Sequence, residues 1–108
     1  MINQDILEKQ AKIAYLSIGS NLGNRYHNIE KTKFELSKKK IFIINSSKYY
    51  ESLSWPDPRK PKFYNIVLKV KTRFTKKKLL LICKNIEKSL GRKKTPINSP
   101  RICDIDII

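Results

Sequence analysis

Apolar and polar residues alternate in several short stretches of this chain, and two longer stretches carry the spacing of a helix. Lys12 to Ile18 is mostly apolar at both alternating sets of positions, which predicts a strand buried on both faces. Turn-forming residues from Gly19 to Asn24 follow it. Apolar residues at helical spacing then predict a helix from about Arg25 to Lys39. Ile41 to Glu51, rich in Ile and Tyr, predicts a second strand.

The second half of the chain repeats this pattern after a loop. Ser52 to Lys62 holds three prolines, which cannot donate to a strand ladder, so we expect a loop there. Phe63 to Arg73 alternates and predicts a third strand. Thr75 is a suitable N-cap for a second helix, which we expect Gly91 to end. Arg101 to Ile108 predicts the fourth strand.

The predicted order is therefore strand, helix, strand, strand, helix, strand. It predicts an α+β fold, a ferredoxin-like βαββαβ sandwich in which two helices cover one face of an antiparallel sheet. At 108 residues the chain is long enough for a single modest core, and we expect one domain over residues 12–108 after an N-terminal extension of residues 1–11. Because this architecture hosts many functions, the function has to be inferred from particular residues.

The chain is strongly basic, with 24 Lys and Arg against 9 Asp and Glu and a formal net charge of +15. Such a surplus is typical of proteins that bind nucleotides, nucleic acids or anionic surfaces. The lysines, however, are spread widely along the chain beside abundant Ile and Asn. We therefore favour a general compositional bias over a dedicated nucleic-acid patch.

Cys83 and Cys103 form no C-x-x-C motif, and each lies in an apolar stretch. We expect both to be small core residues of a protein in a reducing compartment. The first eleven residues lack the apolar stretch of a signal peptide, and no run approaches the length of a membrane span. These observations predict a soluble, cytoplasmic protein without a membrane partner, and we expect a monomer.

Asp104 and Asp106 stand two residues apart in a stretch that is otherwise Ile and Cys. In a strand both carboxylates project from the same face, where they repel each other unless a cation lies between them. Mg²⁺ is usually held by one or two carboxylates and keeps its other positions for water and phosphate oxygens. Arg101, just upstream, is placed to meet such a phosphate. The alternative is an edge strand whose acidic side chains lie in water.

Five segments carry motifs that occur together, in this order, in one enzyme family. They are Ala14-Tyr15-Leu16-Ser17-Ile18-Gly19-Ser20-Asn21-Leu22-Gly23, Ser46 to Ser52 followed by Trp55-Pro56-Asp57-Pro58, Phe63-x-Asn65, Ile86-Glu87-x-x-x-Gly91-Arg92 and Ser99-Pro100-Arg101-Ile102-Cys103-Asp104-Ile105-Asp106-Ile107. Over the range from Ala14 to Ile108 the chain resembles 6-hydroxymethyl-7,8-dihydropterin pyrophosphokinase, an enzyme of folate biosynthesis. The resemblance implies transfer of pyrophosphate from ATP to the hydroxymethyl group of the pterin, with release of AMP.

The resemblance also assigns the phosphate side of the site. Asp104 and Asp106 match the aspartates that hold two Mg²⁺ ions against the ATP triphosphate. Arg92 and Arg101 match catalytic basic residues that contact the phosphates. A solvated basic loop is the alternative for both arginines.

On the pterin side, the resemblance implies five contacts with the substrate. Ser52, Leu53 and Trp55 match loop residues that line the pterin pocket, Phe63 matches an aromatic near the ring, and Asn65 matches a residue that hydrogen-bonds it. Alternatives stay open, because Asn65 can instead satisfy a backbone group, Phe63 can be an ordinary core residue and Trp55 can be a lid or a packing anchor.

One further motif and one further residue are expected to support the site rather than to bind a ligand. Gly19 to Asn21 lacks the Gly-Lys-Ser/Thr ending of a phosphate-binding P-loop, so we expect a turn that supports the pterin loop. Glu87 lies near the metal pair by resemblance, although a carboxylate on a helix surface has the same sequence signature.

The chain departs from the family pattern in two places. Asn98 stands where the family often has Trp, and the chain stops two residues after Asp106, before the segment that normally carries nucleotide contacts and a closing aromatic. We therefore expect a truncated form without the ATP-side lid. The alternatives to an active enzyme are a catalytically incomplete remnant with the same fold and, ranked last, a basic RNA-binding module. RNA ranks last because the acidic pair repels a phosphate backbone and no RNA-recognition motif is present.

Overall fold

The structure, a computed structural model, describes residues 7–91 and 99–108. Within these ranges the chain forms five strands and two helices. In chain order they are β1 (Leu7–Ser20), α1 (Arg25–Lys38), β2 (Phe42–Ser46), β3 (Tyr50–Ser52), β4 (Phe63–Phe74), α2 (Lys76–Ser89) and β5 (Asp104–Ile107).

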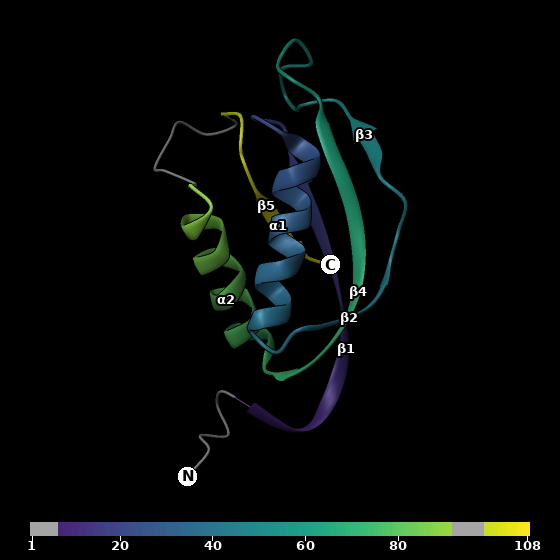
Figure 1. The fold of residues 1–108 in the computed structure, drawn as a ribbon, viewed down its shortest axis with the longest axis vertical. Coiled ribbons are helices and arrows are strands. Elements are labelled where there is room, and N and C mark those ends of the chain that lie inside the picture. Colours follow the sequence, from purple (N-terminus) through teal and green to yellow (C-terminus); the bar gives the residue numbers. More distant parts are fainter. Residues whose placement is uncertain (1–6, 92–98) are drawn as a thin grey trace.

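The strands form one antiparallel sheet in the spatial order β2, β4, β1, β5, and the short β3 also pairs with β4. Figure 1 shows α1 and α2 side by side against one face of this sheet. The predicted α+β class is therefore confirmed, with two helices and an antiparallel sheet. The figure also shows the end of β1, the loop between β3 and β4 and the segment that leads into β5 at the same end of the molecule.

The core lies between the helices and the sheet and is built from alternate strand positions. Strands β1, β4 and β5 contribute Leu16, Ile18, Ile66, Leu68, Val70 and Ile105, and the helices contribute Ile29, Leu36, Leu79, Cys83 and Ile86. Burial raises the pKa of the Cys83 thiol to about 12, so this cysteine stays protonated, and Cys103 is buried as well. Both thiols are core residues, as the sequence predicts.

The prediction that the first strand is buried on both faces is wrong. Leu16 and Ile18 are fully buried, but Ile13 and Tyr15 are 47% and 45% exposed. The cause is the placement of the helices: within residues 7–91 and 99–108, both pack on the face that Leu16 and Ile18 occupy. The other face, which we call the open face, carries no helix from these ranges.

Local signals position both helices. Asn24 caps α1 by accepting a hydrogen bond from the backbone N–H of His27 at 3.0 Å, and Thr75 caps α2 through Lys78 at 3.2 Å, as predicted. Gly91 follows α2 with a φ of +102°, the left-handed conformation that a glycine adopts without strain. Neither helix of the described part is long and apolar enough to span a membrane.

The second predicted strand, from Ile41 to Glu51, is divided into β2 and β3. Between them the Ser47 hydroxyl accepts a hydrogen bond from the Val67 N–H at 2.8 Å, while the Ser47 N–H donates to Val67 O at 2.9 Å. A side-chain oxygen thus replaces a backbone carbonyl, and the regular ladder stops there.

The first and the last predicted strands in chain order also differ in length from the observed strands β1 and β5. β1 begins at Leu7, so part of the range predicted as an extension belongs to the strand, although its register is irregular before Lys12. β5 begins at Asp104 rather than Arg101, because the backbone of Arg101 hydrogen-bonds to Asn21, beyond the end of β1.

Lys40, between α1 and β2, has a φ of +63°, which is unfavourable for a residue with a side chain. We predict that Lys40→Gly raises the free energy of unfolding, by about 1 kcal/mol or less, because relief of strain exceeds the added freedom of the unfolded chain. Urea denaturation at equilibrium measures this change. The matched control is Lys31→Gly, at an exposed position inside α1, which should lower stability by about 1 kcal/mol. Equal losses in both variants would contradict the prediction.

Candidate active site

The two aspartates of β5 lie on the open face of the sheet. Cys103 and Ile105, which alternate with them, are 1% exposed and pack into the core. Asp104 and Asp106 therefore project together from the opposite face, as their spacing predicts. Asp104 is partly buried and Asp106 is exposed.

A row of directly paired residues connects Asp104 to the residues predicted to bind a pterin. Gly19 in β1 lies opposite Asp104 on one side and Asn65 on the other, and Asn65 in turn lies opposite Tyr50. A Cβ atom on Gly19 would lie 2.8 Å from Asn65 Oδ1 and 3.1 Å from Phe63 Cδ1. The side chains of Asn65 and Phe63 therefore lie over the Gly19 backbone, in space that any other residue would fill.

Asn65 is 9% exposed, and the NH2 group of its side-chain amide hydrogen-bonds to other residues of the protein. Its Nδ2 donates to Ser52 Oγ at 2.9 Å and to Tyr50 O at 3.3 Å, so the alternative that it satisfies a backbone group applies to this nitrogen. Its Oδ1, which faces Gly19, accepts no hydrogen bond from residues in the described ranges. One acceptor of this amide is thus left for a ligand, and Ser52 orients it.

The loop from Leu53 to Lys62 is held at both ends while its middle is exposed. At its start Ser54 is buried; at its end, Lys62 O accepts a hydrogen bond from Arg25 Nη1 at 3.1 Å. Leu53 is exposed, and Trp55 is 80% exposed. Both apolar side chains are therefore accessible to a ligand, and the exposure of Trp55 contradicts the alternative that it is a packing anchor.

The middle of this loop is organised locally. Side-chain and backbone hydrogen bonds from Arg59 hold the pKa of the Asp57 carboxyl below its ordinary value. Both side chains lie at the surface, and their contact stabilises the loop conformation without joining the loop to the site.

Asn21 joins the loop to the segment that precedes β5. Its Nδ2 donates to Ser54 Oγ and to Pro61 O, both at 3.1 Å, while its Oδ1 accepts from the Arg101 N–H at 2.7 Å. The expectation that the Gly19–Asn21 motif supports the loop agrees with these bonds. Sequence reasoning missed the link to Arg101, and it gave no role to Arg25. For the link to Arg101, the signal in the sequence was an Asn directly after the first strand.

Arg101 and Asp104 form an ion pair, with 2.9 Å between Arg101 Nη1 and Asp104 Oδ1. The arginine predicted to contact phosphate and one predicted metal ligand are thus in direct contact. Arg92, the other predicted basic residue, and Asn98 lie outside the described residues.

The acidic pair fits a magnesium ion that arrives with a phosphate ligand. No group of three or more His, Cys, Asp or Glu side chains that could hold a metal occurs in the described part of the chain. Two carboxylates on one face are, however, the donor set that Mg²⁺ commonly takes from a protein when water and phosphate oxygens complete its shell. Asp104 and Asp106 are therefore the residues that would hold it.

Glu87 in α2 supports β5 from the side of the helices. Its side chain is 2% exposed, and its Oε2 accepts the backbone N–H of Ile105 at 2.7 Å. Ile105 lies between the two aspartates, so this bond fixes the strand segment that presents them. The alternative of an exposed helix-surface carboxylate is therefore wrong.

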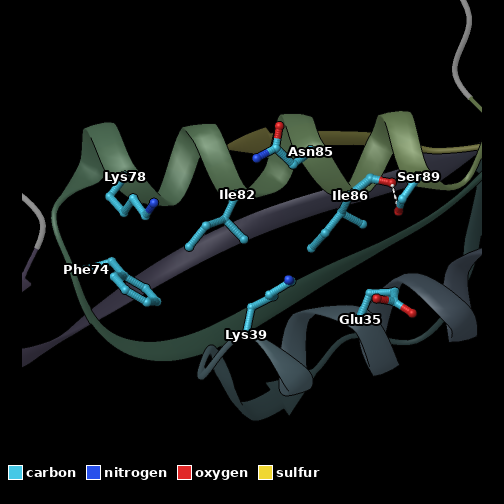
Figure 2. A pocket seen from close by; sticks show the side chains of 8 residues that line it. All are labelled: Glu35, Lys39, Phe74, Lys78, Ile82, Asn85, Ile86 and Ser89. Atoms are coloured by element: carbon cyan, nitrogen blue, oxygen red, sulfur yellow. Dashed lines mark hydrogen bonds between the residues drawn. The ribbon is translucent and has the colours of Figure 1, made fainter.

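A groove of about 460 Å³ opens elsewhere, between α1 and α2 (Figure 2). Figure 2 shows Ile82 and Ile86 lining it from α2, Lys39 and Glu35 from the side of α1, and Phe74 at one end. It lies on the helix side of the sheet, away from Asp104 and Asp106, and is not part of the candidate site.

The fold and the site define an α+β protein in which an acidic pair shares one sheet face with an amide, an aromatic ring and an exposed loop. Residues 15–108 match the family model of 7,8-dihydro-6-hydroxymethylpterin-pyrophosphokinase (HPPK). The chain therefore belongs to the HPPK family.

Individual relatives agree with this assignment. A 2-amino-4-hydroxy-6-hydroxymethyldihydropteridine pyrophosphokinase of Aquifex aeolicus is 40% identical over 94 residues, which cover 87% of this chain and 58% of that protein. Folic acid synthesis protein fol1 of Schizosaccharomyces pombe is 39% identical over 98 residues, which cover 90% of this chain and 13% of that protein. The chain thus spans little more than half, or much less, of these relatives.

We predict that Glu87→Ala lowers the free energy of unfolding by about 1 to 3 kcal/mol, because the buried Ile105 N–H loses its acceptor. Glu87→Gln keeps an acceptor oxygen and should retain most of the stability. The control is Glu35→Ala in α1, whose pair with Lys38 near the surface should be worth about 0.5 kcal/mol or less. Urea titrations compare the three variants, and a loss in Glu35→Ala as large as that in Glu87→Ala would refute the assignment.

Proposed function

We propose that the protein transfers pyrophosphate from ATP to 6-hydroxymethyl-7,8-dihydropterin and releases AMP, a step of folate biosynthesis. The observation that carries this proposal is the row Asp104–Gly19–Asn65 on the open face. In this row Asp104 of the acidic pair and the Asn65 amide lie on either side of Gly19, in a chain of the HPPK family, which supports a metal-bound phosphate next to a bound pterin.

On the pterin side, Asn65 Oδ1 accepts a hydrogen bond from a ring N–H of the substrate, while Ser52 holds the amide in orientation. Phe63, whose ring lies beside Asn65 over Gly19, supplies an apolar contact for the flat ring system. Leu53 and Trp55 close over the substrate from the exposed loop. The pterin thus lies with its hydroxymethyl group directed toward β5.

On the phosphate side, Asp104 and Asp106 hold Mg²⁺, and Arg101 exchanges part of its contact with Asp104 for a phosphate oxygen. The metal, when bound with ATP, neutralises phosphate charge. Arg92 keeps the role predicted for it from the family motif, a second cation at the phosphates. These groups hold the triphosphate beside the pterin hydroxyl.

The reaction is a displacement at the β-phosphorus of ATP. The pterin hydroxyl oxygen forms a bond to this phosphorus and releases its proton to solvent, and the bond from the phosphorus to the oxygen shared with the α-phosphate breaks. AMP leaves with that oxygen. The residues above supply positioning and charge stabilisation, which account for most of the rate in phosphoryl transfer.

The strand order supports a further assignment. The sequence β2, β4, β1, β5 with two helices on one face is the arrangement expected of a ferredoxin-like fold in which the second strand is divided into β2 and β3. We propose that classification here. A monomeric state, a cytoplasmic location and a single domain over residues 12–108 stay predictions from the sequence.

We predict that Asp104→Asn and Asp106→Asn each slow AMP release at least about 100-fold, the equivalent of about 3 kcal/mol in the barrier, because charge on the triphosphate is no longer balanced. AMP is measured by chromatography with ATP, the pterin and Mg²⁺, and EDTA should stop its formation. Glu35→Gln, which removes one charge on the helix side, is the control and should keep the wild-type rate.

Two outcomes would revise the proposal. AMP release that survives both Asp substitutions would exclude the acidic pair as the metal site. Pterin binding without AMP release by the wild-type chain would favour a non-catalytic pterin-binding protein of the same fold.

We predict that Gly19→Ala weakens pterin binding about 10-fold or more, because its methyl group would displace the amide of Asn65 and the ring of Phe63. Isothermal titration calorimetry with 6-hydroxymethyl-7,8-dihydropterin measures the dissociation constant. Ile13→Ala, on the same face of β1 but six residues away, is the control and should bind as the wild type does. Unchanged affinity in Gly19→Ala would remove Asn65 and Phe63 from the pterin site.

A further inference from the structure

Asn21 makes contacts with three separate parts of the chain although it is only 4% exposed. Its partners Ser54, Pro61 and Arg101 are 33, 40 and 80 residues away along the sequence. Its backbone N–H also donates to Arg101 O at 3.0 Å, so Arg101 is held by both its N–H and its carbonyl. The residue therefore connects the loop that carries Trp55 to the backbone that carries the Arg101 guanidinium.

Both ends of the amide are needed for this connection. The acceptor end receives the Arg101 N–H, and the donor end reaches Ser54 Oγ and Pro61 O. A carboxylate offers acceptors alone and cannot bind the Pro61 carbonyl, and an ammonium offers donors alone and cannot bind the Arg101 N–H, so no such charged side chain satisfies both of these groups. Because the site is buried, a mismatch at either end leaves a polar group without a partner and costs about 1 to 3 kcal/mol.

We propose that Asn21 is a positioning residue that couples the loop of residues 53–62 to Arg101 and Asp104. Ser54 and Pro61 hold the Asn21 amide in the orientation that fixes the Arg101 backbone, and the Arg101 side chain is thereby aligned beside Asp104. Coupling of this kind acts in both directions, so a nucleotide that orders Arg101 also favours the loop conformation in which Ser54 and Pro61 hold Asn21. The identity of the two ligands rests on the proposed function, whereas the coupling itself does not.

The first test needs no ligand and uses the exchange of the Arg101 amide hydrogen, followed by NMR at pH 7. In Asn21→Asp the acceptor for the Arg101 N–H remains and is stronger, but the second oxygen faces the Pro61 carbonyl. If Asn21 acted on Arg101 alone, this amide would exchange as slowly as in the wild type, or more slowly. Coupling predicts the opposite sign, an exchange rate about 5-fold or more above that of the wild type.

Ser54→Ala provides a second variant, milder than Asn21→Asp. It removes one partner of Asn21 in the loop and should also speed exchange at Arg101, 47 residues away in sequence. Asp57→Ala, which removes a contact confined to the same loop, and Asn45→Asp, at an exposed site in β2, are the controls and should leave the Arg101 amide unchanged. Unchanged exchange at Arg101 in both Asn21→Asp and Ser54→Ala would overturn the proposal.

The second test uses the two ligands. Pterin affinity is measured with and without α,β-methylene-ATP and Mg²⁺, because a methylene group at the bond that breaks prevents the reaction. The nucleotide should tighten pterin binding about 5-fold or more in the wild type and by much less in Asn21→Asp and Ser54→Ala. Equal enhancement in all three proteins would contradict the coupling. If the wild type bound neither ligand, the proposed function would fail, while the exchange experiment would still decide the role of Asn21.

Discussion

The site depends on the register in which β1 pairs with its two neighbours at Gly19. This residue lies opposite Asp104 in β5 and Asn65 in β4, so one strand position joins the acidic pair to the amide. A slip of one residue would turn Asp104 and Asp106 into the core and bring Ile105 to the surface. Such a slip is excluded by the cost of burying two carboxylates without partners. The hydrophobic core therefore decides on which face of the sheet the acidic pair lies.

Two buried polar side chains then fix the segment that this register presents. Asn21 holds the backbone of Arg101 before β5 begins, and Glu87 holds the N–H of Ile105 within it. β5 is short and lies at the end of the strand order, where a strand has a ladder partner on one side only. Without these two contacts its aspartates would have less defined positions, which the proposed phosphoryl transfer would tolerate poorly. The same hydrogen bonds thus stabilise the fold and position the residues of the proposed site, which is why variants at Glu87 need a stability measurement beside an activity measurement.

Much of the architecture and the common face of the acidic pair can be predicted from local patterns. The Thr75 cap and the common face of Asp104 and Asp106 are confirmed, because capping and strand alternation involve residues a few positions apart. The division of the second strand was missed because the Ser47 hydroxyl takes the place of a backbone partner, which periodicity does not reveal. The exposure of Tyr15 was missed because an apolar strand reads the same whether one face or both are covered.

The amino-acid order alone determines the helices, the alternation of the strands, the spacing of the acidic pair and the motifs of the HPPK family. The folded chain decides which of these features meet. It places Gly19 between Asp104 and Asn65, leaves the Asn65 side-chain oxygen without a hydrogen-bond donor among residues 7–91 and 99–108, and gives Asn21 partners up to 80 residues away. Contacts of that range follow from the joint burial of many apolar side chains and from the need of every buried polar atom for a partner, and neither is a property of any short segment.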